Sequence, residues 1–154
     1  MDTNKNTGVE SLHPDTVYVY RFIYKNAQLG MGTLGKIHPL SCCKDLNEIL
    51  LGQRRGYTAI LRNAANELAL CGARPYGMSA YEKLYTCLII HLHTASGKHR
   101  THIIGHLITS ATVQAIEGAR IRRRSPMADE KSLELLERFL RFQDANCKKL
   151  KEFL

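Results

Sequence analysis

Long apolar runs are missing from the sequence, and no stretch approaches the roughly 18–20 consecutive apolar residues that a membrane-spanning helix requires. The first segment, Met1–Asp15, is polar and lacks the apolar stretch of a secretory signal peptide. We therefore expect an intracellular protein whose contact with any membrane is peripheral.

Cysteine and histidine patterns typical of metal sites are also missing. There are five cysteines, an odd number, and no C-x-x-C pair: Cys42, Cys43, Cys71, Cys87 and Cys147. This usage favours reduced thiols over a disulfide framework. His99, His102 and His106 fall at i, i+3 and i+7, but no Asp, Glu or Cys lies between positions 88 and 116 to complete a metal site. We predict that these histidines, with His91 and His93, extend a basic face, and that the protein holds no metal or cofactor.

Motifs of the common enzyme classes do not occur. The sequence has no phosphate-binding G-x-x-x-x-G-K loop, no G-x-G-x-x-G after a strand and no G-x-S-x-G nucleophile turn. Six of the 14 acidic residues lie in the C-terminal segment, where their spacing indicates a solvated helix face, and no carboxylates are paired for acid–base work. We therefore expect a binding protein without catalytic residues.

An excess of positive charge is the main compositional feature. Lys and Arg number 22 against 14 Asp and Glu, for a formal net charge of +8 and a pI near 9.4. This balance favours a polyanionic partner, either nucleic acid or an anionic membrane surface.

The positive charge is concentrated in three clusters. They comprise Arg54, Arg55 and Arg62; then Lys98, His99 and Arg100; and finally Arg120, Arg122, Arg123 and Arg124. No aromatic residues are interleaved with the arginines, so we expect binding to backbone or headgroup charge, without base stacking or sequence readout. Each cluster alone is equally compatible with a solvated surface turn. Arg122–Arg124 also fits part of a nuclear import signal.

Periodicity predicts a mixture of strands and helices in the part of the chain that precedes the arginine cluster at 120–124. Met1–Asp15 is expected to be a flexible arm, and the β-branched and aromatic Thr16–Tyr24 a strand. The three glycines of Asn26–Gly35 indicate a turn, a bulge or a second strand. A short helix from Ser41 to Gly52, an exposed basic turn at Gln53–Gly56 and a helix at Thr58–Cys71 follow; a strand is expected at Tyr85–Thr94. Thr101–Ile121 fits a helix or a two-stranded meander.

The C-terminal segment, residues 125–154, is predicted to be a long amphipathic helix. Acidic residues at its start and lysines at its end complement the helix dipole. Apolar residues recur in heptads, interrupted by Gln143, and they form a candidate self-association surface: Leu133, Leu136, Leu140, Cys147, Leu150 and Leu154. The same row also fits docking onto the chain's own domain.

A resemblance to the central region of rhabdovirus matrix proteins covers residues 47–95, roughly fifty of the 154. It rests on an N-E-I-x-x-G motif at Asn47–Gly52, a helix ending L-A-L-x-G-A at Leu68–Ala73, and a Tyr-led segment from Tyr81 to Leu88-Ile89. The resemblance implies an α+β fold over residues 16–124, with a small sheet flanked by helices, followed by the amphipathic C-terminal helix. It also favours strands over a helix for Thr101–Ile121.

The same resemblance implies a viral assembly protein of the virion, the host cytoplasm and the inner membrane face. A location in the host nucleus is suggested only by Arg122–Arg124. Its partners would be the viral nucleocapsid, an anionic membrane, a second copy of itself and a viral glycoprotein or phosphoprotein. The late-budding motifs P-P-x-Y, P-T-A-P and P-S-A-P are missing from the sequence. The alternative hypothesis is a small basic RNA-binding protein, such as a nucleoprotein or a silencing suppressor, that recognises backbone charge directly.

Overall fold

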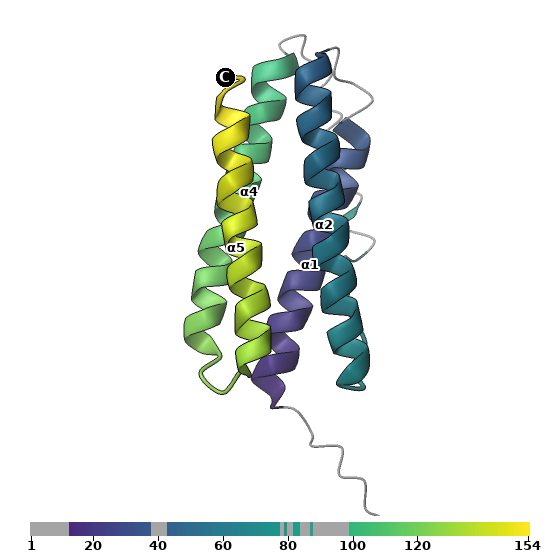
Figure 1. The fold of residues 1–154 in the computed structure, drawn as a ribbon, viewed down its shortest axis with the longest axis vertical. Helices are drawn as coiled ribbons and strands as arrows, with labels where there is room; N and C mark the ends of the chain where they lie inside the picture. The colour runs from purple at the N-terminus through teal and green to yellow at the C-terminus, as the bar shows by residue number, and fades with distance from the viewer. Residues whose placement is uncertain (1–12, 38–42, 78, 80–81, 84–86, 88–98) are drawn as a thin grey trace, which may run out of the picture.

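The computed structural model describes residues 13–37, 43–77, 79, 82–83, 87 and 99–154. Four helices have their bounds within these residues: α1 (Pro14–Ile37), α2 (Lys44–Leu70), α4 (His99–Arg124) and α5 (Glu130–Lys151). They lie lengthwise beside one another (Figure 1). The described part of the chain is therefore a helical bundle, and the predicted arm falls almost entirely outside it.

Two antiparallel hairpins make up the bundle. Helix α1 packs on α2 and α4 packs on α5, while α1 and α5 also contact each other and both remaining helices. Helices α2 and α4 share no contact, so they lie on opposite sides of the bundle. The α1–α2 hairpin occupies one side of the view and the α4–α5 hairpin the other (Figure 1).

The predicted α+β class is wrong, because the described residues contain no strand. Thr16–Tyr24 and the glycine-rich Asn26–Gly35 both lie within α1. Buried residues of α1 recur every three or four positions, namely Val19, Ile23, Ala27, Gly30, Leu34 and Ile37. Burying this helical stripe outweighs the β preference of single residues, which is a weak and context-dependent effect.

The turn predicted at Gln53–Gly56 is also wrong, since α2 passes through it without a break. Gln53 and Tyr57 are buried there. Gly56 lies against Phe142 of α5, so that a Cβ at this position would collide with the phenyl ring. This glycine therefore marks a close helix–helix approach and not a chain reversal.

Of the two alternatives for Thr101–Ile121, the helix is confirmed as part of α4. The strand predicted at Tyr85–Thr94 lies outside the described residues, apart from Cys87. The segment that precedes it runs over α1: Arg21 stacks on the Tyr76 ring at 4.1 Å, and Lys25 pairs with Glu82 at 2.5 Å. Two outward basic side chains of α1, Arg21 and Lys25, therefore have partners within the protein itself.

The predicted C-terminal helix is confirmed as α5. Asp129 caps it by accepting a hydrogen bond from the backbone N–H of Ser132 at 2.9 Å. Leu136 and Phe139 are completely buried in one apolar cluster with residues of α1, α2 and α4. Helix α5 therefore shares its core with the segment 16–124.

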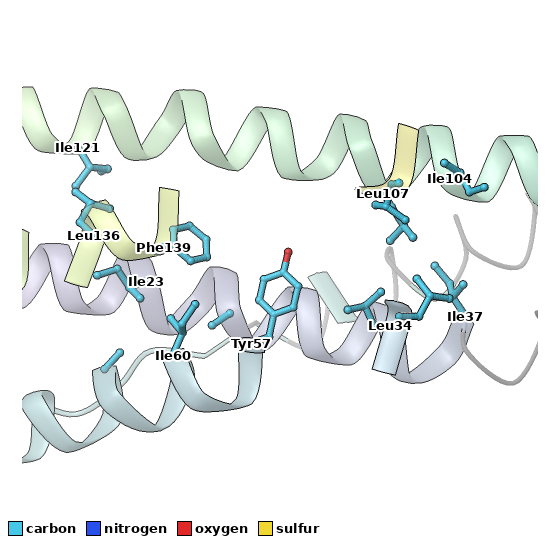
Figure 2. Packing of buried hydrophobic residues seen from close by; sticks show 14 of the residues in the cluster. Ile23, Leu34, Ile37, Tyr57, Ile60, Ile104, Leu107, Ile121, Leu136 and Phe139 are labelled. Carbon is cyan, nitrogen blue, oxygen red and sulfur yellow. The ribbon is translucent and has the colours of Figure 1, made fainter. Parts of the chain in front are cut away.

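The apolar cluster runs along the bundle as one core (Figure 2). Phe139 and Leu136 lie on one side of Tyr57, and Leu34 and Leu107 lie on the other. Tyr57 lies between them with its hydroxyl group pointing into the bundle (Figure 2). At this level the interior becomes polar.

Candidate functional site

The first basic cluster lies on α2, where Arg54, Arg55 and Arg62 are all exposed. Arg55 and Arg62 are seven residues apart, so they occupy one outward face at a spacing of about 10 Å along the helix. Arg54 points toward the end of α1, because a Cβ on Gly35 would lie 3.6 Å from its guanidinium carbon. The cluster thus extends from the outward face of α2 to its edge with α1.

Carboxylates do not neutralise this cluster within the described part of the chain. The sequence of α2 has no acidic residue between Glu48 and Glu67. None of the ion pairs between described residues includes Arg54, Arg55 or Arg62. All three guanidinium groups keep their donors for an external partner.

The third cluster lies at the C-terminal end of α4 and is partly neutralised. Arg120 pairs with Glu117 of the same helix, and Arg122 pairs with Glu137 of α5 at 2.9 Å. Arg123 and Arg124 are exposed and belong to no ion pair between described residues. Basic residues in the last turn also interact favourably with the negative end of the helix dipole.

The second cluster lies at the opposite end of the same helix. Lys98 is outside the described residues, while His99 and Arg100 begin α4. Because α4 has 26 residues, its ends are about 37 Å apart. Since α2 and α4 also lie on opposite sides of the bundle, the nine described basic positions do not form one patch.

The candidate self-association residues lie mostly inside the chain's own bundle. Leu136 and Leu150 are buried in the core, and Cys147 is 9% exposed. Leu133 and Leu140 are half-buried, and Leu140 packs against Gly118 of α4. Leu154, at 63% exposure, is the one large apolar side chain of the set that faces solvent. The heptad row is therefore accounted for mainly by internal packing.

Metal-binding geometry is not found in the described residues: no three His, Cys, Asp or Glu side chains come together there. His91 and His93 lie outside these residues. Within the same limits, none of the helices has the length and apolar character needed to cross a bilayer.

A hydrogen-bonded chain that includes none of the predicted site residues crosses the middle of the bundle. The Tyr57 hydroxyl donates to Oε1 of Gln143 at 2.6 Å, and Nε2 of Gln143 donates to Oε1 of Gln114. Nε2 of Gln114 then donates to the Ser110 hydroxyl at 3.2 Å. Burial raises the pKa of Tyr57 to about 12, although the hydrogen bond to Gln143 opposes this shift.

One sequence signal pointed to this chain. Gln143 interrupts the apolar row of α5, and it is completely buried between Tyr57 and Gln114. A buried glutamine is retained in a helical core when its amide is hydrogen-bonded, as it is here.

The chain matches no protein-family model, no curated protein and no solved structure.

Proposed function

We propose that this protein binds the phosphate backbone of RNA through the arginines of α2, without catalysis and without reading sequence. The supporting observation is that Arg54, Arg55 and Arg62 are exposed and free of ion pairs with described residues, on a helix stretch without acids. Guanidinium groups can bind phosphate oxygens bidentately. The spacing of about 10 Å between Arg55 and Arg62 corresponds to roughly three base-pair steps along the axis of a nucleic-acid duplex.

An RNA backbone fits this surface better than a membrane does. Beside the arginines, the other exposed residues of α2 are small or polar, such as Ala59 and Asn66. Leu70, the large exposed apolar side chain of this helix, lies at its C-terminal end, eight residues beyond Arg62. A helix that lies in the membrane interface needs large apolar side chains beside its basic residues. The exposed Val113 and Ile116 are on α4, on the opposite side of the bundle. The α2 face therefore offers charge without an apolar anchor.

The matrix-like assembly role rests on the sequence resemblance alone, because the sheet that the resemblance implied is not present in the described residues. Nucleocapsid contact, attachment to an anionic membrane and self-association belong to that hypothesis. Binding to RNA backbone is the part of it that the α2 arginines support.

Three phosphate contacts give modest affinity, so we expect a dissociation constant on the order of 10⁻⁵ M for duplex RNA of arbitrary sequence near physiological salt. The test compares the wild-type chain with Arg55→Gln/Arg62→Gln and with the matched control Arg123→Gln/Arg124→Gln. Both variants remove two exposed arginines and the same charge.

Fluorescence anisotropy with a labelled RNA duplex at low salt should show that Arg55→Gln/Arg62→Gln, the α2 variant, binds RNA with at least about 10-fold lower affinity than the wild type. The control should stay close to the wild type. Equal losses in both variants would mean that net charge alone drives binding, and would refute the assignment to α2. Flotation with vesicles of anionic phospholipid provides the other arm: vesicle binding without RNA binding would transfer support to the matrix-like hypothesis.

A further inference from the structure

A small cavity, lined by several polar side chains among apolar ones, lies at the centre of the bundle, at the level of Tyr57. Its volume is about 20 Å³. All four bounded helices contribute to its lining, which includes Thr33 of α1, Gln53 and Tyr57 of α2, Ser110 of α4 and Asn146 of α5. Polar side chains from every helix therefore converge on one interior point.

Two amide groups beside this cavity lack protein partners. Nε2 of Gln53 and Nδ2 of Asn146 are buried, and neither has a hydrogen-bond partner of good geometry among the described residues, although Asn146 lies close enough to Tyr57 to lower the pKa of its hydroxyl. Both side chains belong to residues that are only 5% exposed. A buried donor without an acceptor destabilises a fold, so these two amides indicate a ligand that accepts hydrogen bonds.

The cavity volume limits the size of that ligand. A cavity needs a volume of about 10–15 Å³ to hold one water molecule, and the water needs two to four polar partners. The observed 20 Å³ satisfies this requirement and excludes anything much larger. The hydroxyl oxygens of Thr33 and Ser110 can accept the hydrogen bonds that a water donates.

We infer that the cavity binds a single structural water, which accepts hydrogen bonds from Gln53 and Asn146 and donates to hydroxyl groups of the lining. This water connects α2 and α5 to α1 and α4, and it extends the direct hydrogen-bonded chain from Tyr57 to Ser110. Sliding one helix past another would separate these partners, so the layer also fixes the alignment of the four helices.

A high-resolution crystal structure of the complete chain tests the inference. One peak of electron density is expected in the cavity, within hydrogen-bond distance of both amide nitrogens. In the double variant Gln53→Leu/Asn146→Leu the peak should be lost. Direct pairing of the two amides with protein groups and no peak would overturn the inference, as would a peak that persists in the double variant.

Nuclear Overhauser contacts between water and the two side-chain amides, measured on the wild-type chain in solution, give an independent reading of the same site. Contacts at Gln53 and Asn146 are expected. If the amides instead show contacts only to protein protons, the water is not bound there. Neither measurement depends on RNA binding, so this inference and the proposed function can fail separately.

Discussion

Replacing Gly30 with alanine tests the packing at the centre of the bundle. A Cβ at this position would lie 2.7 Å from Cε2 of Tyr57, with other ring atoms closer still. The ring cannot easily move away, because its hydroxyl is bonded to Gln143 and its edge packs on Phe142, with centroids 4.9 Å apart. Gly32, on the same helix, is the matched control, since nothing lies within 4 Å of its Cβ position.

The two substitutions should have opposite effects on the free energy of unfolding. Alanine in a helix interior is favoured over glycine by roughly 0.5–1 kcal/mol, so Gly32→Ala should stabilise the protein by about that amount. At position 30 the same gain is present, but overpacking against the ring costs about 1–3 kcal/mol or more. We therefore expect Gly30→Ala to be less stable than Gly32→Ala by about 1–3 kcal/mol.

Urea unfolding followed by far-ultraviolet circular dichroism measures both variants on one scale. In a thermal unfolding experiment on a chain of this length, each kcal/mol of stability corresponds to a shift in melting temperature of about 2–4 °C. If the Gly30→Ala and Gly32→Ala variants unfold at the same urea concentration, the close approach of α1 and α2 at Tyr57 is incorrect.

Two further predictions concern Tyr57 and the start of α5. Because burial raises the pKa of Tyr57 from 10.0 to about 12, the fold favours the neutral phenol. The neutral phenol therefore contributes to the free energy of unfolding below pH 10. As the pH rises toward about 12 this contribution, roughly 2–3 kcal/mol, should be lost. Urea titrations across this range should show the loss in the wild type, and Tyr57→Phe should abolish this component; an equal loss in both would contradict the assignment. Asp129→Ala removes the cap of α5 and should cost about 0.5–2 kcal/mol, whereas Asp129→Asn should cost much less. Thermal unfolding of the two Asp129 variants checks this, and identical melting temperatures would show that the cap contributes nothing.

The C-terminal helix could be predicted because local and long-range signals agree there. The capping Asp129, the acidic first turn, the lysines of the last turn and the apolar row all favour the same helix. In α1 they conflict: the side chains of Thr16–Tyr24 favour a strand, while the helical stripe from Val19 to Ile37 becomes apparent only over the whole segment. A window as short as Thr16–Tyr24 does not contain the whole helical stripe, and the glycines of Asn26–Gly35 locally favour a turn, a bulge or a second strand.

The wrong prediction of a turn at Gln53–Gly56 depends on a glycine. Gly56 indicates a turn in isolation, but its role is to admit the ring of Phe142 from a helix nearly ninety residues away in the sequence. Such a role depends on a tertiary contact that no local pattern contains. The hydrogen-bonded chain of buried amides also depends on tertiary contacts. In the sequence its one sign is Gln143, which interrupts the apolar row of α5.

The candidate basic site was partly predictable. Charge density in the sequence located the three clusters, but their positions depend on helix lengths. Had α4 been two short strands, Arg100 and Arg120 could have lain close together; as one helix it holds the two clusters at opposite ends. Ion pairing of Arg122 with Glu137 likewise depends on how α4 and α5 pack.

The salt dependence of RNA binding tests the central claim, which is that the α2 arginines contact phosphates. Three contacts to a duplex give a slope of about −2.7 in a plot of the logarithm of the association constant against the logarithm of the salt concentration. This slope corresponds to roughly a 40-fold loss of affinity between about 50 and 200 mM salt. Arg55→Gln/Arg62→Gln should reduce the slope to about −0.9, because one contact, that of Arg54, remains. An unchanged slope in this variant would show that the phosphate contacts lie elsewhere on the protein.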